Sequence, residues 1–562
     1  MTKPHGLDGG LTNYGDRDFA RFLRRSFARS MGVSRALLDK PVVGIAMTPS
    51  GFNNCHRLMP DLVEAVSRGV LAAGALPRAF PTISLGEVFL NPTSMVYRNL
   101  MAMDTEEMII AQPMDAVVLI GGCDKTVPAQ LMGAVSAGVP AIQLVTGPMS
   151  TGRHRGQRLG ACTDCRAFWA KYRAGSVGAE EIAEVEGRLA VTAGTCAVMG
   201  TASTMACIAE TLGMALPGSA AIPAVHADRL VAAEETGRAA AALIANPIPP
   251  ERIITEKSVE NALRVLMALS GSTNAVIHLA AIAGRLGLRL SLERLNQISD
   301  ETPTLVDLKP VGQGYMEDFH AAGGLGAVLR ELKPLLHLET IDVTGRTLGA
   351  RLAEPLNWID RAVIRPFDDP IAKFGGLIAL KGTLAPDGAI LKRAAATPAL
   401  FEHEGRAVVF DGLEDLAKRI DDPRLDVTPD DVLVLKNAGP KAAGMPEAGY
   451  LPIPKKLAKA GVKDMLRVSD ARMSGTAFGT IVLHAAPEAA VGGPLAAARS
   501  GDRIRLSVEK RRIDLLVADE EIRRRLAARQ PPPTPARGYK ALYAKSVTQA
   551  PDGCDFDFLM KR

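Results

Sequence analysis

One short segment, residues 116–120, restricts the fold of this chain more than any other. All five of its residues are apolar and three are β-branched, which is typical of a buried strand in a parallel sheet. Two glycines follow and allow a sharp turn, and Cys123, Asp124 and Lys125 come next. Ligands of open α/β sheets collect at the carboxyl ends of the strands, so this turn is a candidate binding site. A buried thiol beside a surface Asp–Lys pair is the plain alternative.

The alternation of strand and helix continues along the first half of the chain. Strands are expected at residues 42–47, 78–80, 116–120 and 141–145, with helical patterns between them. From about residue 178 to 288 the pattern is mostly helical. The fold class predicted for this part is α/β, with a largely parallel sheet.

Short strands separated by turn residues replace the helices after about residue 366. They are expected at 376–384, 389–392, 407–410, 432–435, 480–484 and 503–508. We therefore expect an N-terminal arm over residues 1–40, an α/β domain over 41–365 and a β-barrel-like domain over 366–562. The first domain would carry the candidate metal ligands, and the second would carry a candidate catalytic serine.

Composition excludes some classes of function. A net charge of +5 over 562 residues, with 4% aromatic residues, gives no case for nucleic-acid binding. Residues 189–209 are uncharged and long enough to span a bilayer, but their Thr, Ser and Gly content predicts a buried helix beside a ligand instead of a membrane span. The basic segment 21–35 follows acidic residues, unlike a transit peptide. Without a signal peptide, we expect a cytoplasmic protein whose seven cysteines serve metal binding or catalysis.

Three cysteines occupy similar positions. Cys55, Cys123 and Cys196 each lie in a Gly- or Asn-rich loop at the edge of an apolar element. Three thiolates could hold an iron–sulfur cluster and leave one iron position open for a substrate. The alternative is three buried structural cysteines. Cys162 and Cys165 form a CxxC motif, which is either a redox pair or two ordinary thiols.

Carboxylates and hydroxyls supply the other candidates. Glu87, Asp124 and Glu447 could bind Mg²⁺, although any one of them could instead be a solvated surface group. Ser474 and Thr476 flank a glycine in what could be a simple tight turn. Such a hydroxyl acts as a base only where a metal or cation lowers its pKa, and no His–Asp partner for a hydrolase triad is evident.

Five separated segments, taken together, resemble the dihydroxy-acid dehydratase / phosphogluconate dehydratase family. They are Asn53-Asn54-Cys55-His56, Gly122-Cys123-Asp124-Lys125-Thr126-Val127-Pro128, residues 194–206, Gly271-Ser272-Thr273-Asn274 and Asp470-Ala471-Arg472-Met473-Ser474-Gly475-Thr476. They occur in the family's order, and the resemblance extends from about residue 40 to residue 510.

The resemblance implies an α/β domain, a C-terminal β-barrel domain and an active site between them, in a homodimer or homotetramer. It also implies an iron–sulfur cluster and Mg²⁺, and carbamylation of Lys125 would turn that amine into an oxygen ligand. The implied site residues are Cys55, Cys123 and Cys196 for the cluster, Glu87, Asp124, Lys125 and Glu447 for Mg²⁺, and Ser474 as base with Thr476 and Lys125 beside it.

The segment around Ser474 separates the branches of the family. The branch of branched-chain amino acid biosynthesis typically has Asp-Gly-Arg-Phe-Ser-Gly-Gly-Thr there, and Ala471 and Met473 depart from it. This segment is more similar to the sugar-acid branch of arabinonate and xylonate dehydratases, which implies a [2Fe–2S] cluster, with [4Fe–4S] as the alternative. The expected reaction converts a 2,3-dihydroxy carboxylate to a 2-keto-3-deoxy acid and water.

Three other functions stay open at this stage. One is dehydration of 2,3-dihydroxyisovalerate to 2-ketoisovalerate, in amino acid biosynthesis. Another is a thiol-redox protein that uses Cys162 and Cys165. The third is a non-catalytic iron–sulfur sensor.

Overall fold

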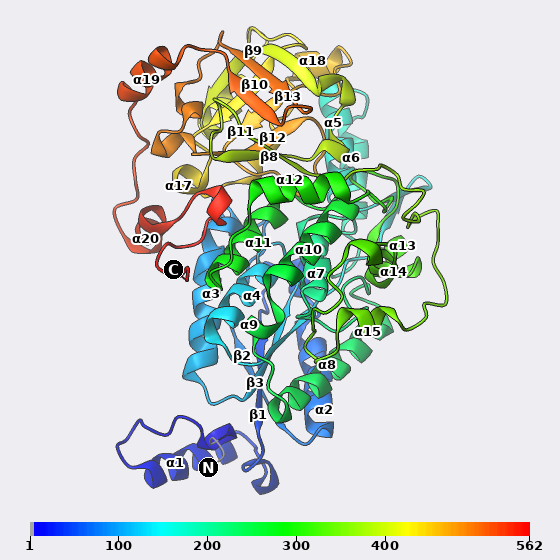
Figure 1. Cartoon of the computed structure of the whole chain (residues 1–562), viewed down its shortest axis with the longest axis vertical. Coiled ribbons are helices and arrows are strands. Elements are labelled where there is room, and N and C mark those ends of the chain that lie inside the picture. Colours follow the sequence, from blue (N-terminus) through cyan, green and yellow to red (C-terminus); the bar gives the residue numbers. More distant parts are fainter. Residues whose placement is uncertain (1–4, 562) are drawn as a thin grey trace.

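A four-stranded parallel sheet forms the centre of the first domain in the computed structural model, which describes residues 5–561 (Figure 1). The strand order is β2-β1-β3-β4. The bounds are β1 Val42–Met47, β2 Leu76–Pro81, β3 Ala116–Gly121 and β4 Ala141–Val145. Helices α2 (Met59–Ala72) and α8 (Ala227–Ala245) pack together beside the sheet, and α3 (Ser94–Ala111) and α4 (Thr126–Ala137) form a second pair.

The parallel arrangement determines where the loops lie. Val43 of β1 pairs with Ala116 of β3, and Val117 pairs with Ala141 of β4. These apolar residues are fully buried, so helices cover the sheet on both faces. Because neighbouring strands run in the same direction, the loops that follow β1 and β3 leave the sheet at the same edge.

The rest of the first domain is mostly helical, and the helical pattern expected over residues 178–288 is confirmed. The helices are α5 Thr163–Ala174, α6 Ala179–Leu189, α7 Thr201–Thr211, α9 Pro250–Ile253, α10 Glu256–Ala268, α11 Asn274–Arg285, α12 Leu292–Glu301, α13 Met316–Ala321, α14 Gly324–Glu331 and α15 Leu348–Leu352. A short hairpin, β5 (Gly152–His154) with β6 (Gln157–Leu159), precedes α5.

The prediction of one buried helix over residues 189–209 is wrong in its first half. Residues 190–200 form a loop, and only α7 is helical and buried. Gly194 has φ +124°, and a Cβ at this position would lie 2.6 Å from the backbone nitrogen of Met149. A helix through Gly194 would need a different backbone conformation, so the run of small residues serves a close-packed loop instead.

The second domain is built on an eight-stranded sheet in the order β14-β13-β9-β10-β11-β12-β8-β7. Its strands are β7 Ile378–Leu380, β8 Gly388–Leu391, β9 Glu402–Asp411, β10 Val432–Lys436, β11 Arg467–Ser469, β12 Ile481–Ala486, β13 Arg503–Ser507 and β14 Arg512–Leu515. Lys381, just after β7, exchanges backbone hydrogen bonds with Arg511 and Ile513 and thereby brings the two edge strands together. The sheet is nearly closed, which confirms the predicted α/β fold with a barrel-like second domain.

Within this sheet β9, β10, β11 and β12 are mutually parallel. The loops after β10 and β11 therefore emerge side by side, and they face the first domain. Short helices fill the connections: α16 Leu413–Arg419, α17 Pro440–Ala443, α18 Lys455–Lys459, α19 Asp519–Ala527 and α20 Gly538–Ser546.

The two ends of the chain lie outside the sheets. Helix α1 (Arg17–Ser30) stands apart from the body in Figure 1, whereas the C-terminal segment returns to the first domain. There Arg285 pairs with Asp555 at 2.7 Å, and both side chains are fully buried. None of the helices within residues 5–561 combines the length and apolar character that a membrane crossing requires.

Candidate active site

Several thiols gather at the carboxyl edge of the first sheet. Cys55 follows β1, Cys123 follows β3, and Cys196 lies in the loop before α7. Interaction with the Cys123 thiol and burial raise the pKa of Cys55 well above its usual value, and Cys162 and burial do the same for Cys196. The Sγ atoms of Cys162 and Cys196 are 3.5 Å apart. The three predicted cluster cysteines are thus brought together, and Cys162 joins them.

His56 holds the loop that carries Cys123. Its Nδ1 donates to the carbonyl oxygen of Thr48 at 2.8 Å, which leaves Nε2 as an acceptor. Nε2 accepts backbone N–H groups from Gly122 at 3.1 Å and from Cys123 at 3.3 Å. Burial lowers the pKa of His56 to about 4, so the ring stays neutral and can accept both bonds. His56 therefore orients the loop that carries Cys123.

Three carboxylates form a second group beside the thiols. Oxygen atoms of Glu87, Asp124 and Glu447 all lie within 4.8 Å of one another. Asp124 directly follows Cys123, and its charge contributes to the raised pKa of Cys55. Glu447 comes from the loop after β10 in the second domain. The carboxylate group therefore spans the boundary between the two sheets.

Arg472 joins the carboxylates from the two domains. Its side chain is fully buried, and it donates to Glu87 at 2.6 Å and to Glu447 at 2.7 Å. Burial alone would raise the pKa of Glu87, but the charges of Arg472 and Lys125 outweigh burial and hold it far below its usual value. Burial raises the pKa of Glu447 despite the same arginine.

Lys125 is a second cation of this group, and Arg166 lies 3.7 Å from Glu447 as a third. It is completely buried, and its Nζ lies 3.4 Å from an oxygen of Asp124 and 3.5 Å from an oxygen of Glu87. A buried amine needs such partners, because an isolated buried charge is very unfavourable. The predicted neighbours of Lys125 are therefore present.

Ser474 lies in the loop after β11, in the same seven-residue segment as Arg472. Its Oγ is 2.8 Å from Oγ1 of Thr476, and both side chains are buried. Thr163 donates to the carbonyl oxygen of Thr476 at 3.0 Å, which links the loop to the residue beside Cys162. Asn274 donates to the carbonyl oxygen of Met473 at 3.1 Å.

Gly475 allows this loop to touch the first domain. A Cβ there would lie 2.6 Å from the backbone nitrogen of Thr201 and 2.7 Å from the side chain of Ser272. Thr201 begins α7, and Ser272 precedes α11. Only glycine permits this approach. The small residues predicted for this turn are therefore explained by its close packing against the first domain.

The donor sets fit the two groups that the sequence suggests. Adjacent thiols suit an iron–sulfur cluster, and a compact set of carboxylates suits Mg²⁺. Arg472 was absent from the candidate residues. Three carboxylates in one place need a positive charge beside them. The arginine in the small-residue loop next to the candidate base Ser474 could have been proposed for that role from the sequence.

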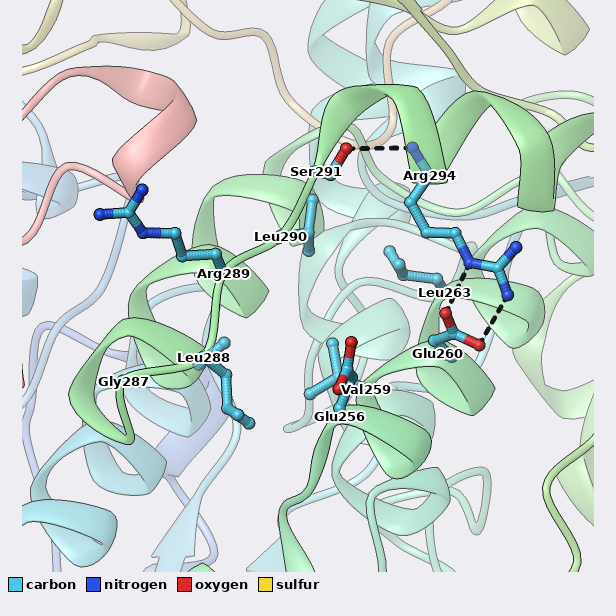
Figure 2. A pocket seen from close by; sticks show the side chains of 11 residues that line it. Glu256, Val259, Glu260, Leu263, Gly287, Leu288, Arg289, Leu290, Ser291 and Arg294 are labelled. Atoms are coloured by element: carbon cyan, nitrogen blue, oxygen red, sulfur yellow. Dashed lines mark hydrogen bonds and ion pairs between the residues drawn. The ribbon is translucent and has the colours of Figure 1, made fainter.

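The groove in Figure 2 lies elsewhere, between α10, α11 and α12. Its volume is about 340 Å³, and no candidate site residue lines it. Glu260 in this groove is already bonded to Arg294, at 2.6 and 2.9 Å, and to His337, at 2.9 Å. The groove is separate from the site described above.

Comparison with known proteins identifies the family of the chain. The profile "Dihydroxy-acid/6-phosphogluconate dehydratase N-terminal" matches residues 40–351, and the corresponding C-terminal profile matches residues 362–554. The chain is 46% identical to the 6-deoxy-6-sulfo-D-gluconate dehydratase of Pseudomonas putida, covering 96% of this chain and 94% of that protein.

Two further relatives cover nearly the whole chain. The L-arabinonate dehydratase of Rhizobium leguminosarum bv. trifolii is 45% identical, over 97% of this chain and 95% of its own. A dihydroxy-acid dehydratase of Clostridium botulinum is 37% identical, over 94% and 97%. The chain therefore belongs to the dihydroxy-acid/6-phosphogluconate dehydratase family and is a dehydratase, that is, a hydro-lyase.

Proposed function

We propose that this dehydratase converts an aldonic sugar acid, such as L-arabinonate or D-xylonate, to a 2-keto-3-deoxy acid and water. One observation supports the proposal: a single loop of the second domain contacts the carboxylate group and the residue next to Cys162, whose Sγ atom lies 3.5 Å from that of Cys196. Arg472 in this loop binds Glu87 and Glu447, and Thr476 accepts a bond from Thr163, next to Cys162. Ser474 lies between these two contacts in the sequence.

We assign the ligand sets as follows. Cys55, Cys123 and Cys196 would hold an iron–sulfur cluster, and Glu87, Asp124, Glu447 and Lys125 would surround Mg²⁺. When bound, the two groups would supply a Lewis acid for the leaving 3-hydroxyl and positive charge for the substrate carboxylate. The similarity of the segment with Ala471 and Met473 to the sugar-acid branch implies a [2Fe–2S] cluster, with [4Fe–4S] as the alternative.

Ser474 is the proposed base. It would take the proton from C2 of the substrate, and the C–H electron pair would form the C2–C3 double bond as the 3-hydroxyl leaves. The same proton would then pass to the leaving oxygen, so that water departs and an enol stays. The enol tautomerises to the 2-keto acid. Thr476, 2.8 Å from Ser474, would orient the hydroxyl, and the cations nearby would favour its ionised form.

Lys125 is a candidate for carbamylation. A carbamate would add an oxygen ligand, but also a negative charge next to Glu87 and Asp124. It is therefore expected to form together with Mg²⁺ binding and to be absent without the metal. Labelled bicarbonate would reveal it by NMR, and a Lys125→Met variant gives the background. A carbamate signal that is independent of Mg²⁺ would contradict this view.

The substrate is tested with enzyme purified without oxygen and assayed with Mg²⁺. Formation of 2-keto acid is measured from L-arabinonate, D-xylonate, D-gluconate and 2,3-dihydroxyisovalerate. We expect the highest kcat/KM for a sugar acid, because the sugar-acid dehydratases are 45–46% identical to this chain and the dihydroxy-acid dehydratases 37–38%. Activity confined to 2,3-dihydroxyisovalerate would overturn the substrate proposal and leave the family intact.

We further propose a homodimer or homotetramer in a reducing compartment such as the cytoplasm. Helix α1 exposes Phe19, Phe22 and Phe27, and Met31 follows it. Exposed apolar residues in one place are typical of a protein interface. Sedimentation analysis of the full chain tests the assembly, and a monomer at micromolar concentration would contradict it.

A further inference from the structure

Cys162 and Cys165 have no part in the proposed reaction, yet they lie at the cluster site. Cys162 immediately precedes α5, and Cys165 lies in its first turn. The Sγ atom of Cys162 is 3.5 Å from that of Cys196. Cys165 is close enough to Cys162 for the two thiols to interact. Cys162 is thus a neighbour of both a proposed cluster ligand and a second free thiol.

The backbone around this pair is fixed by buried contacts. Asp164, between the two cysteines, accepts hydrogen bonds from Lys309 at 2.7 Å, from Tyr315 at 2.9 Å and from the backbone of Gly160 at 2.7 Å. Thr163 is anchored to the Ser474 loop. These contacts hold the pair against Cys196.

The three cysteines are not completely enclosed by the protein. Cys162, Cys165 and Cys196 are half-buried, whereas Cys207 and Cys554 are buried. A disulfide needs a sulfur–sulfur distance of about 2 Å, so the Cys162 and Cys196 sulfurs must approach by roughly 1.5 Å. Rotation about the side-chain bonds can supply a movement of this size.

We propose that Cys162 and Cys165 form a dithiol couple that returns an oxidised Cys196 to its thiol. The inference rests on the proposed function, because it takes Cys196 as a cluster ligand. A ligand thiol blocked by oxidation cannot bind iron. The couple would therefore keep the site able to take up its cluster after oxidative damage.

Each step is a thiol–disulfide exchange. Oxidised glutathione reacts with the Cys196 thiolate, which forms a mixed disulfide and releases one glutathione. The Cys162 thiolate attacks the Cys196 sulfur, forms the Cys162–Cys196 disulfide and releases the second glutathione. Cys165 then attacks the Cys162 sulfur, and Cys196 leaves as a thiolate. In sum, two protein thiols are oxidised and one glutathione disulfide is reduced.

The test is disulfide mapping by mass spectrometry on the full-length enzyme after exposure to oxidised glutathione. We expect the wild type to contain the Cys162–Cys165 disulfide and a free Cys196. Cys165→Ser should trap the Cys162–Cys196 disulfide, and Cys162→Ser should keep glutathione on Cys196. Cys207→Ala, at a buried thiol outside the group, serves as the control and should match the wild type.

Two results would overturn the couple. One is glutathione retained on Cys196 in the wild type, with Cys162 and Cys165 still reduced. The other is a Cys162→Ser protein that has lost its iron before any oxidant is added, because Cys162 would then be a ligand. Iron content measured before oxidation tests the cluster, and disulfide mapping tests the couple, so the two proposals fail on separate measurements.

Discussion

Arg472 is the residue on which the carboxylate group depends. It is buried between Glu87 and Glu447, which come from different domains. Without a cation there, three carboxylates within 4.8 Å would repel one another. Mg²⁺ would add positive charge to the same group, so arginine and metal are expected to act in the same direction on stability.

Replacing Arg472 with methionine tests whether this arginine and Mg²⁺ stabilise the same carboxylate group. Removing one partner of a buried ion pair should lower the stability by about 3–5 kcal/mol. Mg²⁺ should raise the Tm of Arg472→Met more than that of the wild type, because it restores positive charge. The matched control is Arg424→Met, at an exposed arginine that pairs with Asp422. An equal effect of Mg²⁺ on all three proteins would show that Arg472 and the metal are not linked.

Lys392 gives a second prediction for a single residue. Its amine is fully buried and has no hydrogen-bond partner among residues 5–561. Burial lowers the pKa of Lys392 from 10.5 to about 7. Between these two pH values the unfolded chain binds the proton and the folded chain does not, so stability rises with pH across this window. Below pH 7 the amine is charged in both the folded and the unfolded chain, so the full cost of burying this charge lowers the stability.

Lys392→Met should therefore raise the Tm most below about pH 7, and the gain should shrink towards about pH 10. Thermal unfolding followed by circular dichroism across this range measures the effect. The exposed Lys510 provides the control, since Lys510→Met should show no such dependence. A gain for Lys392→Met that is the same at every pH would mean that the amine is not titrating as described.

Among the elements, the parallel strands explain why much of the site could be predicted. Cys55 and Cys123 follow strands β1 and β3, which the apolar runs in the sequence reveal, and adjacent parallel strands bring their loops together. Glu447 and Ser474 follow β10 and β11 in the same way. Strand β11 has only three residues, too few for an apolar pattern to be recognised. The strand pattern alone therefore did not show that the loops of Glu447 and Ser474 are neighbours. A barrel-like sheet was predicted, but strand β14 and the residues at which the sheet closes, Lys381 with Arg511 and Ile513, were not.

The loop after β11 gives the prediction at this scale. Gly475→Ala would push a methyl group against Thr201 and Ser272, which should cost about 1–3 kcal/mol and lower turnover by moving Ser474. Gly187→Ala is the control: Gly187 lies inside α6 with open space around it, so alanine should be neutral or stabilising. Chemical denaturation and kcat measure both effects. Unchanged stability in Gly475→Ala would show that the domains do not need this close contact.

At the scale of the whole molecule, the candidate active site lies between the two sheets. The first domain contributes the thiols, Glu87, Asp124 and Lys125, and the second contributes Glu447, Arg472 and Ser474. The family resemblance of five short segments predicted a site between two domains, and the segments lie on both sides of this boundary. It did not foresee the return of the C-terminal segment to the first domain, because the Arg285–Asp555 pair joins residues far apart in the sequence. Nor did it foresee the contact of Cys162 with Cys196, which depends on the course of the chain between β4 and α5.

The most direct test compares wild type and Ser474→Ala, both purified without oxygen and supplied with Mg²⁺. Iron content, the visible spectrum and 2-keto acid formation from a sugar acid are measured on the same samples. We expect about two irons per chain in both proteins, for a [2Fe–2S] cluster, and a loss of turnover of at least about 100-fold in the variant. An active Ser474→Ala enzyme would contradict the proposed base, and an active wild type without iron would contradict the cluster.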